Sequence, residues 1–434
     1  MQFRQVQFNS LIMLPGAVKT KIRLLMTAMA FLASLTVVSQ VYPENYLEEA
    51  EQNNPGLQAA RSSYDAALQE PAIASALPDP ELSVGIFTPP MERLMGNQWF
   101  DIRLMQMFPW FGTRPRQREA AEEAANASWQ MYRQQRNSLF MEMTRLWLDI
   151  YRIEEQQKVT REFIGILRAR EDLIYSRYAA GQPGQLLDFY RLQIQIEELE
   201  NRIENLEQEK TALITSFNIL AGRPESAGIE LPAELPEPEL SDGDPVMPGE
   251  FEGNPQLNMA RSREEAAIIR EEISRLMTRP MLGAGIQYSW MQPGDAAMGQ
   301  MDGGHMVMPM FSMTLPVFGA RNRAMREQAA LRAGESAYLV DEQRNDLQIQ
   351  WARLAAIENS LERDRLFLRR QLDITDMAWE LVLTGYASGD RNFDELLGLQ
   401  DQLLDLEWRL VENTADLHIR RAEKDLLLAR DIFE

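Results

Sequence analysis

The feature that most constrains this chain is a heptad pattern that occurs twice. From Leu192 to Leu220, apolar residues recur at steps of four and three, and only Lys210 interrupts them. Apolar residues with an average spacing of about 3.5 form one narrow stripe on a helix, which packs against a partner helix. The spacing returns between Leu399 and Leu417, and four positions correspond at one offset of 207: Leu192 with Leu399, Ile196 with Leu403, Leu199 with Leu406, and Ile203 with Leu410.

A second pair of matching segments supports a duplication. Residues 54–62 (NPGLQAARS) and 254–262 (NPQLNMARS) agree at an offset of 200. Two independent matches of this kind indicate one structural unit built twice. We therefore expect a first repeat over residues 41–221 and a second over 254–434, joined by a proline-rich linker or equatorial segment over 222–253.

The amino-terminal 40 residues differ from the rest of the chain. They carry four basic residues and no acidic one, followed by an apolar run over 24–38. This arrangement predicts a secretory signal peptide over residues 1–40. An uncleaved signal anchor is the alternative, although the apolar run is shorter than the roughly 20 residues of a membrane-spanning helix.

Composition excludes several classes of function. The chain has 44 Lys and Arg against 65 Asp and Glu, and nucleic acid is not an expected partner because phosphate binding needs a basic face. It has no cysteine, so disulfides and thiolate metal sites are excluded. We find no nucleophile with a base, no phosphate-binding glycine loop and no metal-ligand spacing, and we expect neither an enzyme nor a cofactor.

Each repeat also contains a non-helical segment. Residues 99–110 alternate Phe100, Ile102 and Leu104 with polar neighbours such as Asp101, which is typical of a strand with one wet face. This pattern predicts a β-hairpin at about 79–111, and the second copy repeats it at about 281–318. A Pro–Gly bend follows each hairpin, in the sequences FPWFGTR and LPVFGAR.

The remaining residues of each repeat predict two antiparallel helices. Residues 116–180 and 322–387 form helical stretches that would reach roughly 90 Å at 1.5 Å per residue. Each stretch ends at a glycine, Gly181 or Gly389, which suits the left-handed position at a helix end. The heptad helices, over about 187–220 and 393–430, then run back beside the long ones.

Four strands of this kind cannot close a barrel, since about eight is the smallest number in a closed transmembrane barrel. An open sheet in lipid would leave its edge amides and carbonyls unpaired. If the hairpins lie in a membrane, several chains must therefore share one barrel. A homotrimer with twelve strands is the simplest even-numbered solution.

The order of these elements resembles the TolC-type outer-membrane efflux proteins. Both copies of the unit carry the resemblance, and the segment 77–85 (LPDPELSVG) resembles the heavy-metal branch of that family. The resemblance implies a mainly α fold with a transmembrane β component, in which a trimeric β-barrel in the outer membrane continues into an α-helical barrel across the periplasm. It also implies a passive exit duct for heavy-metal ions or small toxic compounds. A periplasmic adaptor and an inner-membrane pump would be its partners, and outer-membrane lipid its surroundings.

The same resemblance suggests a gate at the periplasmic tip. Counting from Gly389, Arg391 falls on the family's gate arginine and Glu395 on its first gate aspartate, whereas Gly398 occupies the place of the second. The resemblance thus implies a gate at Arg391, Asp394 and Glu395 that controls opening and cation entry. The alternative is that Asp390, Asp394 and Glu395 merely cap a helix start, where acidic residues complement the helix dipole.

The two helix-hairpin turns are also the adaptor-docking surface that the resemblance implies. Its expected residues are Gln182, Pro183 and Gly184 in the first copy, with Asn392 beside the gate in the second. The alternative for these positions is an ordinary loop between two helices.

Methionine is unusually frequent near the second hairpin, where seven fall between residues 291 and 313. Thioethers are soft ligands that select Cu(I) or Ag(I), so Met298, Met301 and Met306 are weak candidates for transient metal binding. Methionine is equally a flexible apolar filler, and this use needs no metal.

Two other functions compete with an exit duct. A periplasmic adaptor also carries a coiled-coil hairpin, but it has one hairpin and many short strands. A structural coiled-coil protein without a pore would leave the amphipathic strands unexplained. The duct accounts for both the strands and the long helices.

Overall fold

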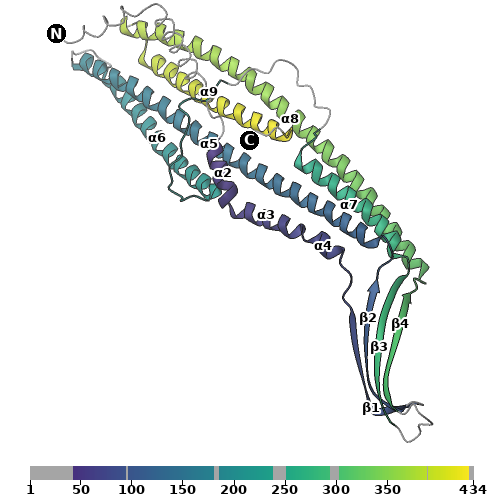
Figure 1. Cartoon of the computed structure of the whole chain (residues 1–434). Helices are drawn as coiled ribbons and strands as arrows, with labels where there is room; N and C mark the ends of the chain where they lie inside the picture. Colours follow the sequence, from purple (N-terminus) through teal and green to yellow (C-terminus); the bar gives the residue numbers. More distant parts are fainter. Residues whose placement is uncertain are drawn as a thin grey trace, which may run out of the picture.

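The computed structural model describes residues 43–93, 96–179, 185–237, 251–293, 303–388 and 390–429. Helices form a long bundle, and a sheet extends from one end of it (Figure 1). The signal peptide expected at residues 1–40 lies outside the described residues.

Two long helices set the dimensions of the bundle. Helix α5 (Thr113–Ala179) has 67 residues and α8 (Gly319–Ser388) has 70. At 1.5 Å per residue each is roughly 100 Å long. Pro115 lies in the first turn of α5, where a missing N–H breaks no helical hydrogen bond.

Shorter helices cover the half of the bundle that is far from the sheet. Helix α6 (Gln185–Ala221) returns along α5, and α9 (Phe393–Leu427) returns along α8 (Figure 1). Helix α9 also contacts α5, so the two repeats share one core here. Leu192, Ile196 and Leu199 of the predicted heptad stripe are buried in that core, against Leu404 and Trp408.

A second set of helices covers the half near the sheet. Helices α2 (Glu44–Asn53), α3 (Pro55–Ala67) and α4 (Glu70–Ala74) belong to the first repeat, and α3 and α4 lie along α5. Helix α7 (Pro255–Met277) packs between α5 and α8. The bundle is therefore made of two full-length helices with half-length helices at either end.

The segment after α6 packs on the helices. Within it, the Leu235 N–H donates to the Tyr151 hydroxyl at 3.2 Å, and the Trp147 indole donates to the Glu230 carbonyl at 3.1 Å. Leu235 is buried with the core residues of α5. Residues 222–237 of the predicted linker thus form a side layer on the middle of the bundle.

The described strands form one four-stranded antiparallel sheet in the order β1-β2-β3-β4. They are β1 (Glu81–Arg93), β2 (Gly96–Phe108), β3 (Met281–Gln292) and β4 (Gly304–Thr314). The two hairpins, one from each repeat, pair through β2 and β3. No described helix has both the length and the apolar composition of a membrane span.

Candidate functional site

The sheet has one strongly apolar face. The register aligns Val84, Ile102, Tyr288 and Val307 in one row across the four strands. Side chains alternate between the faces, so neighbouring rows on this face contain further exposed apolar side chains. Those that are more than a third exposed are Leu82, Val84, Ile86, Ile102, Leu104, Phe108, Leu282, Ile286, Val307, Phe311 and Met313.

Aromatic side chains mark both ends of this apolar face. Phe100 packs near Trp290 with ring centroids 6.0 Å apart at the end with the strand turns, and Trp110 packs near Phe111 at the helix end. Phe100 and Phe108 are eight residues apart on β2, roughly 26 Å at 3.3 Å per residue. An apolar band about 25 Å tall between two aromatic belts is typical of a strand surface in an outer membrane.

The opposite face of the sheet is polar. Arg103 donates to Gln287 at 3.2 Å, and Gln287 donates to Asp101 at 2.8 Å. Gln98 and Ser289 form a further contact of 3.4 Å at a buried position near the turns. One face therefore fits lipid and the other fits water, as the alternation over 99–110 predicts.

The far end of the bundle holds the predicted gate residues. Arg391 and Glu395 form an ion pair of 3.1 Å, one helical turn apart at the start of α9. Asp394 does not join them and instead pairs with Arg191 of α6 at 2.5 Å. Asp394 and Glu395 also lie in the first turn of α9, where their charge complements the helix dipole.

The Arg191–Asp394 pair joins the two repeats at this tip. Burial raises the pKa of the nearby Asp188 carboxyl, Asp394 adds to that rise, and Arg191 and a hydrogen bond with Tyr386 oppose it. Tyr386 in turn packs on Phe393 with ring centroids 5.5 Å apart. The tip thus combines an aromatic contact between α8 and α9 with charged groups from α6 and from the start of α9.

Sequence reasoning did not identify Arg191, Asp188 or Tyr386 as partners of the gate residues. Arg191 and Asp394 are 203 positions apart, and no local spacing relates them. Arg191 precedes Leu192 of the heptad stripe, which was the one available sign that it lies beside a helix interface.

The expected docking residues are described only in part. Gln182, Pro183 and Gly184 lie outside the described residues. Asn392 is the N-cap position of α9, has an extended backbone, and makes no side-chain capping hydrogen bond. Its exposed amide is therefore available at the tip surface.

Of the three methionines that are weak candidates for metal binding, only Met306 is among the described residues. Met298 and Met301 lie outside the described residues. Met306 pairs with Ser289 across β3 and β4, which places it on the polar face near the strand turns. Within the described ranges, no group of three or more His, Cys, Asp or Glu residues could hold a metal ion.

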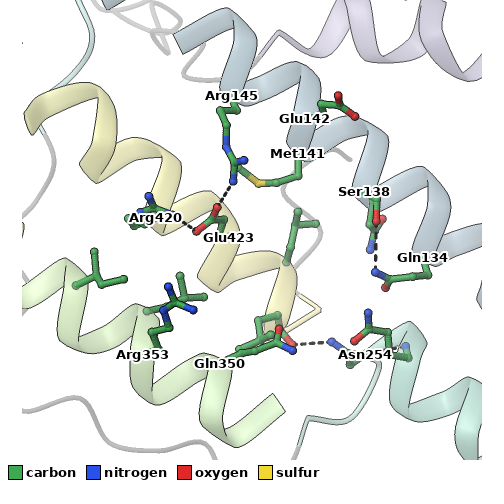
Figure 2. Close-up of a pocket in the computed structure, with 16 residues that line it drawn as sticks. Gln134, Ser138, Met141, Glu142, Arg145, Asn254, Gln350, Arg353, Arg420 and Glu423 are labelled. Carbon is green, nitrogen blue, oxygen red and sulfur yellow. Dashed lines mark hydrogen bonds and ion pairs between the residues drawn. The ribbon is translucent and has the colours of Figure 1, made fainter. Parts of the chain in front are cut away.

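A polar pocket of about 690 Å³ lies between the repeats in the middle of the bundle. Figure 2 shows Glu423 of α9 between Arg145 of α5 and Arg420, with contacts of 2.5 and 2.8 Å. Asn254 and Gln350 line the other end of the pocket. Glu423 joins α9 to α5 through Arg145, so the pocket contains an ion pair between the repeats.

The fold combines an amphipathic antiparallel sheet with long helices that continue from its strands. Residues 46–215 match the sequence model of the family described as outer membrane efflux protein. No curated protein matches the chain.

Several solved outer-membrane channels share this fold over most of their length. VceC from Vibrio cholerae is 16% identical, with a TM-score of 0.73 and coverage of 91% of this chain and 97% of that one. The open state of MtrE from Neisseria gonorrhoeae is 18% identical, with a TM-score of 0.70 and 90% of each chain covered. CusC is 17% identical, with a TM-score of 0.72 and coverage of 90% and 92%.

The family model covers residues 46–215, and the fold shared with these channels extends over most of the chain. Members of this family are transport channels and not enzymes.

Proposed function

We propose that the chain is the outer-membrane component of a tripartite efflux system. Three copies form a passive exit duct, which receives its substrates from an inner-membrane pump through a periplasmic adaptor. The observation that carries this proposal is the open amphipathic sheet. Among the described strands, β1 and β4 each have one neighbour, so each has an edge that another chain can pair.

The number of strands in each sheet favours a trimer. Unpaired edge amides and carbonyls are costly in lipid, and closure removes them. Three sheets of four strands give a barrel of twelve. The apolar face is directed toward lipid, and the polar face with Asp101, Arg103 and Gln287 toward the lumen.

The surface of α8 supports contacts between protomers along the helical part. Large apolar side chains that are more than half exposed recur along it, namely Leu331, Tyr338, Ile349, Ile374, Met377 and Leu381. Exposed apolar area of this extent marks an interaction surface. In the trimer, neighbouring helix pairs cover it and complete a helical barrel.

The tip provides the gate and the docking surface. Arg391 and Glu395 restrain the second turn, and Asp394 ties α9 to α6 through Arg191. Six helix hairpins of the trimer bring these groups around one opening. The adaptor binds there through Asn392 and the first turn, which contains Gln182, Pro183 and Gly184. The exported compounds are heavy-metal ions or small toxic compounds.

The proposal is tested by comparing arginine substitutions at two neighbouring positions of β1. Val84 is on the apolar face and Ser83 is on the polar face. An arginine on the lipid side of a barrel costs about 2–4 kcal/mol near the midplane, whereas lumen positions tolerate it. The Val84→Arg protein should therefore no longer be recovered in the outer-membrane fraction. The Ser83→Arg protein should still be recovered there as a trimer, with a changed conductance in planar bilayers.

A heat-sensitive trimer on gels, recovered from outer membranes, supports the duct over both alternatives. If both variants and the parent are recovered as soluble monomers, the channel proposal fails. If Val84→Arg and Ser83→Arg insert equally well, the assignment of the two faces is wrong.

A further inference from the structure

Three methionines lie on the polar face of the sheet, at the end nearest the helices. We call Met105, Met107 and Met310 the thioether cluster. The register aligns Met105, Gly285 and Met310 in one row across β2, β3 and β4. The adjacent row on the same face contains Met107, Gly283 and Ser312.

The two glycines allow these side chains to meet above β3. A β-carbon at position 283 would overlap the Ser312 hydroxyl and lie 2.7 Å from the Met107 sulfur and 3.4 Å from the Met105 sulfur. A β-carbon at 285 would lie 3.0 Å from the Met105 sulfur. Both sulfur atoms of β2 therefore lie over the backbone of β3 and point toward β4.

Ser312 contacts both of these sulfur atoms. Its hydroxyl lies 3.7 Å from the Met105 sulfur and 3.8 Å from the Met107 sulfur. Thioethers are weak hydrogen-bond acceptors, and the Ser312 hydroxyl lies within reach of both of them. Met310 is half-buried on the same face, in the row of Met105 and two residues before Ser312 on β4.

This arrangement differs from ordinary packing of methionine. The apolar face of the same sheet carries mainly leucine, isoleucine, valine and phenylalanine, with Met313 among them, whereas the cluster lies beside Ser312 and Glu81 on the other face. Glu81 pairs with Met105 across β1 and β2 and lies on the polar face as well. A carboxylate beside soft sulfur ligands favours a soft cation over an anion or a neutral ligand.

We propose that the thioether cluster binds Cu(I) or Ag(I) on the polar face of the sheet. Met105, Met107 and Met310 supply three thioether ligands, and Ser312 and Glu81 lie beside them. The inference rests on the proposed function in one respect, because the polar face must line the duct for the ion to reach it. Met310 is four residues from Met306 on the same face of β4, with Met308 between them, but Met105 and Met107 place the cluster nearer the helices than the site expected near the strand turns.

The position of the cluster suits a cation that arrives from the helical part. Met107 is the penultimate residue of β2, and Ser312 is two residues from the end of β4. An ion that leaves the helical bundle therefore meets these side chains first on entering the sheet. Thioether ligands carry no charge, which permits release of the bound ion farther along the duct.

The test uses purified trimer in detergent, with Ag(I) as a probe that does not change oxidation state. The main variant carries Met105→Leu, Met107→Leu and Met310→Leu together, since leucine keeps the apolar volume. The matched control is Met313→Leu, because Met313 is on β4 but on the apolar face. Equilibrium dialysis against a weak competing ligand measures affinity, and X-ray absorption counts the sulfur neighbours of the bound metal.

The parent and Met313→Leu should each bind one Ag(I) per chain with sulfur neighbours. The triple variant should bind at least about tenfold more weakly and lose the sulfur signal. Met105→Leu alone should weaken binding and remove one sulfur neighbour, which keeps the test valid if the triple variant fails to assemble. Equal affinity and an unchanged sulfur count in Met105→Leu would overturn the site.

The proposed function is assessed separately by conductance in potassium chloride. A parent trimer that conducts but gives the same Ag(I) binding with and without the cluster rejects the metal site alone. A parent protein that forms no conducting trimer rejects the duct.

Discussion

The side-chain amide of Asn254 donates to the carbonyl oxygen of Leu427 at 3.1 Å, while its side-chain oxygen accepts from the N–H of Gln256 at 2.9 Å. Asn54 makes the equivalent bond to Leu220 at 2.9 Å in the first repeat. One asparagine in each repeat thus caps the start of a helix and binds the end of the returning heptad helix. The duplication seen in the sequence corresponds to the same tertiary connection made twice.

Replacement of Asn254 should destabilise the second repeat. Asn254→Ala removes the cap, worth about 1 kcal/mol, and leaves a buried carbonyl without its donor, which costs about 1–3 kcal/mol. Asn254→Ser keeps a capping oxygen, but its side chain is too short to reach Leu427. It should therefore lose only the stabilisation from the hydrogen bond to the Leu427 carbonyl. The thermal unfolding midpoint, measured by circular dichroism, should be highest for the parent, lower for Asn254→Ser and lowest for Asn254→Ala. Equal midpoints for all three would contradict this role.

The sequence predicted local structure well because its signals are local. The stripe through Leu192 and Leu199 depends on the heptad spacing, and both residues are buried as that spacing requires. The strand over 99–110 depends on alternation, and the register places Ile102 and Leu104 on one face. Periodicity shows which face of a helix or strand is buried, even when the element that packs against this face is unknown.

The contacts between repeats could not be predicted in the same way. Nothing in the spacing of residues indicates that α7 lies between α5 and α8, or that Trp147 binds the Glu230 carbonyl. At the tip, the four-residue spacing of Arg391 and Glu395 does allow an ion pair on one helix. The pairing of Asp394 with Arg191 depends instead on how the two hairpins pack, which no local pattern encodes.

A buried charge network between α8 and α9 gives a second prediction. Glu358 accepts from Arg421 at 3.1 Å and from Lys424 at 2.6 Å, and its side chain is 7% exposed. Glu358→Ala leaves two cations without this partner, so unfolding free energy should fall by about 3–5 kcal/mol. Glu342→Ala, at an exposed carboxylate of the same helix, should change it by less than about 0.5 kcal/mol. Denaturant titration of both variants measures the difference, and similar values would exclude a structural role for the network.

His418 gives a prediction about pH. It is buried, and its Nε2 donates to the Pro236 carbonyl at 3.1 Å. Burial lowers the pKa of His418 to about 4, the hydrogen bond to Pro236 opposes that shift, and Arg421 and Arg365 add to it. An unfolded histidine has a pKa of about 6.5, so between these values the unfolded state binds a proton that the folded state does not.

Stability should therefore fall as pH decreases from about 6.5 to about 4, by up to about 3 kcal/mol from this residue. The glutamine of the His418→Gln variant cannot be protonated. The variant should therefore lose the pH dependence of stability that comes from His418 and keep the pH dependence that comes from other groups. Unfolding midpoints measured at several pH values for parent and variant give the comparison. Parallel curves for the two proteins would show that His418 is already protonated in the folded state or is accessible to water.

The Arg191–Asp394 pair gives the last prediction, which concerns the proposed gate. Both side chains are partly exposed, at 39% and 61%, so the pair contributes at most about 1 kcal/mol. Since it joins α6 to α9 across the repeats, its loss should favour separation of the two hairpins at the tip. A change of that size corresponds to a rise of up to about fivefold in the open population.

Single-channel recordings of Arg191→Ala and Arg391→Ala trimers measure that population directly. Each variant should spend more time open than the parent, and high salt should narrow the difference because exposed ion pairs are screened. Arg409→Ala is the control, since its 3.9 Å pair with Asp405 lies within α9 and joins no second helix. If this control opens the channel as much as Arg191→Ala does, the effect comes from overall charge. An effect of Arg191→Ala that Arg409→Ala lacks identifies the connection between the hairpins as the restraint, whereas Arg391→Ala tests the separate pair with Glu395 inside the second turn.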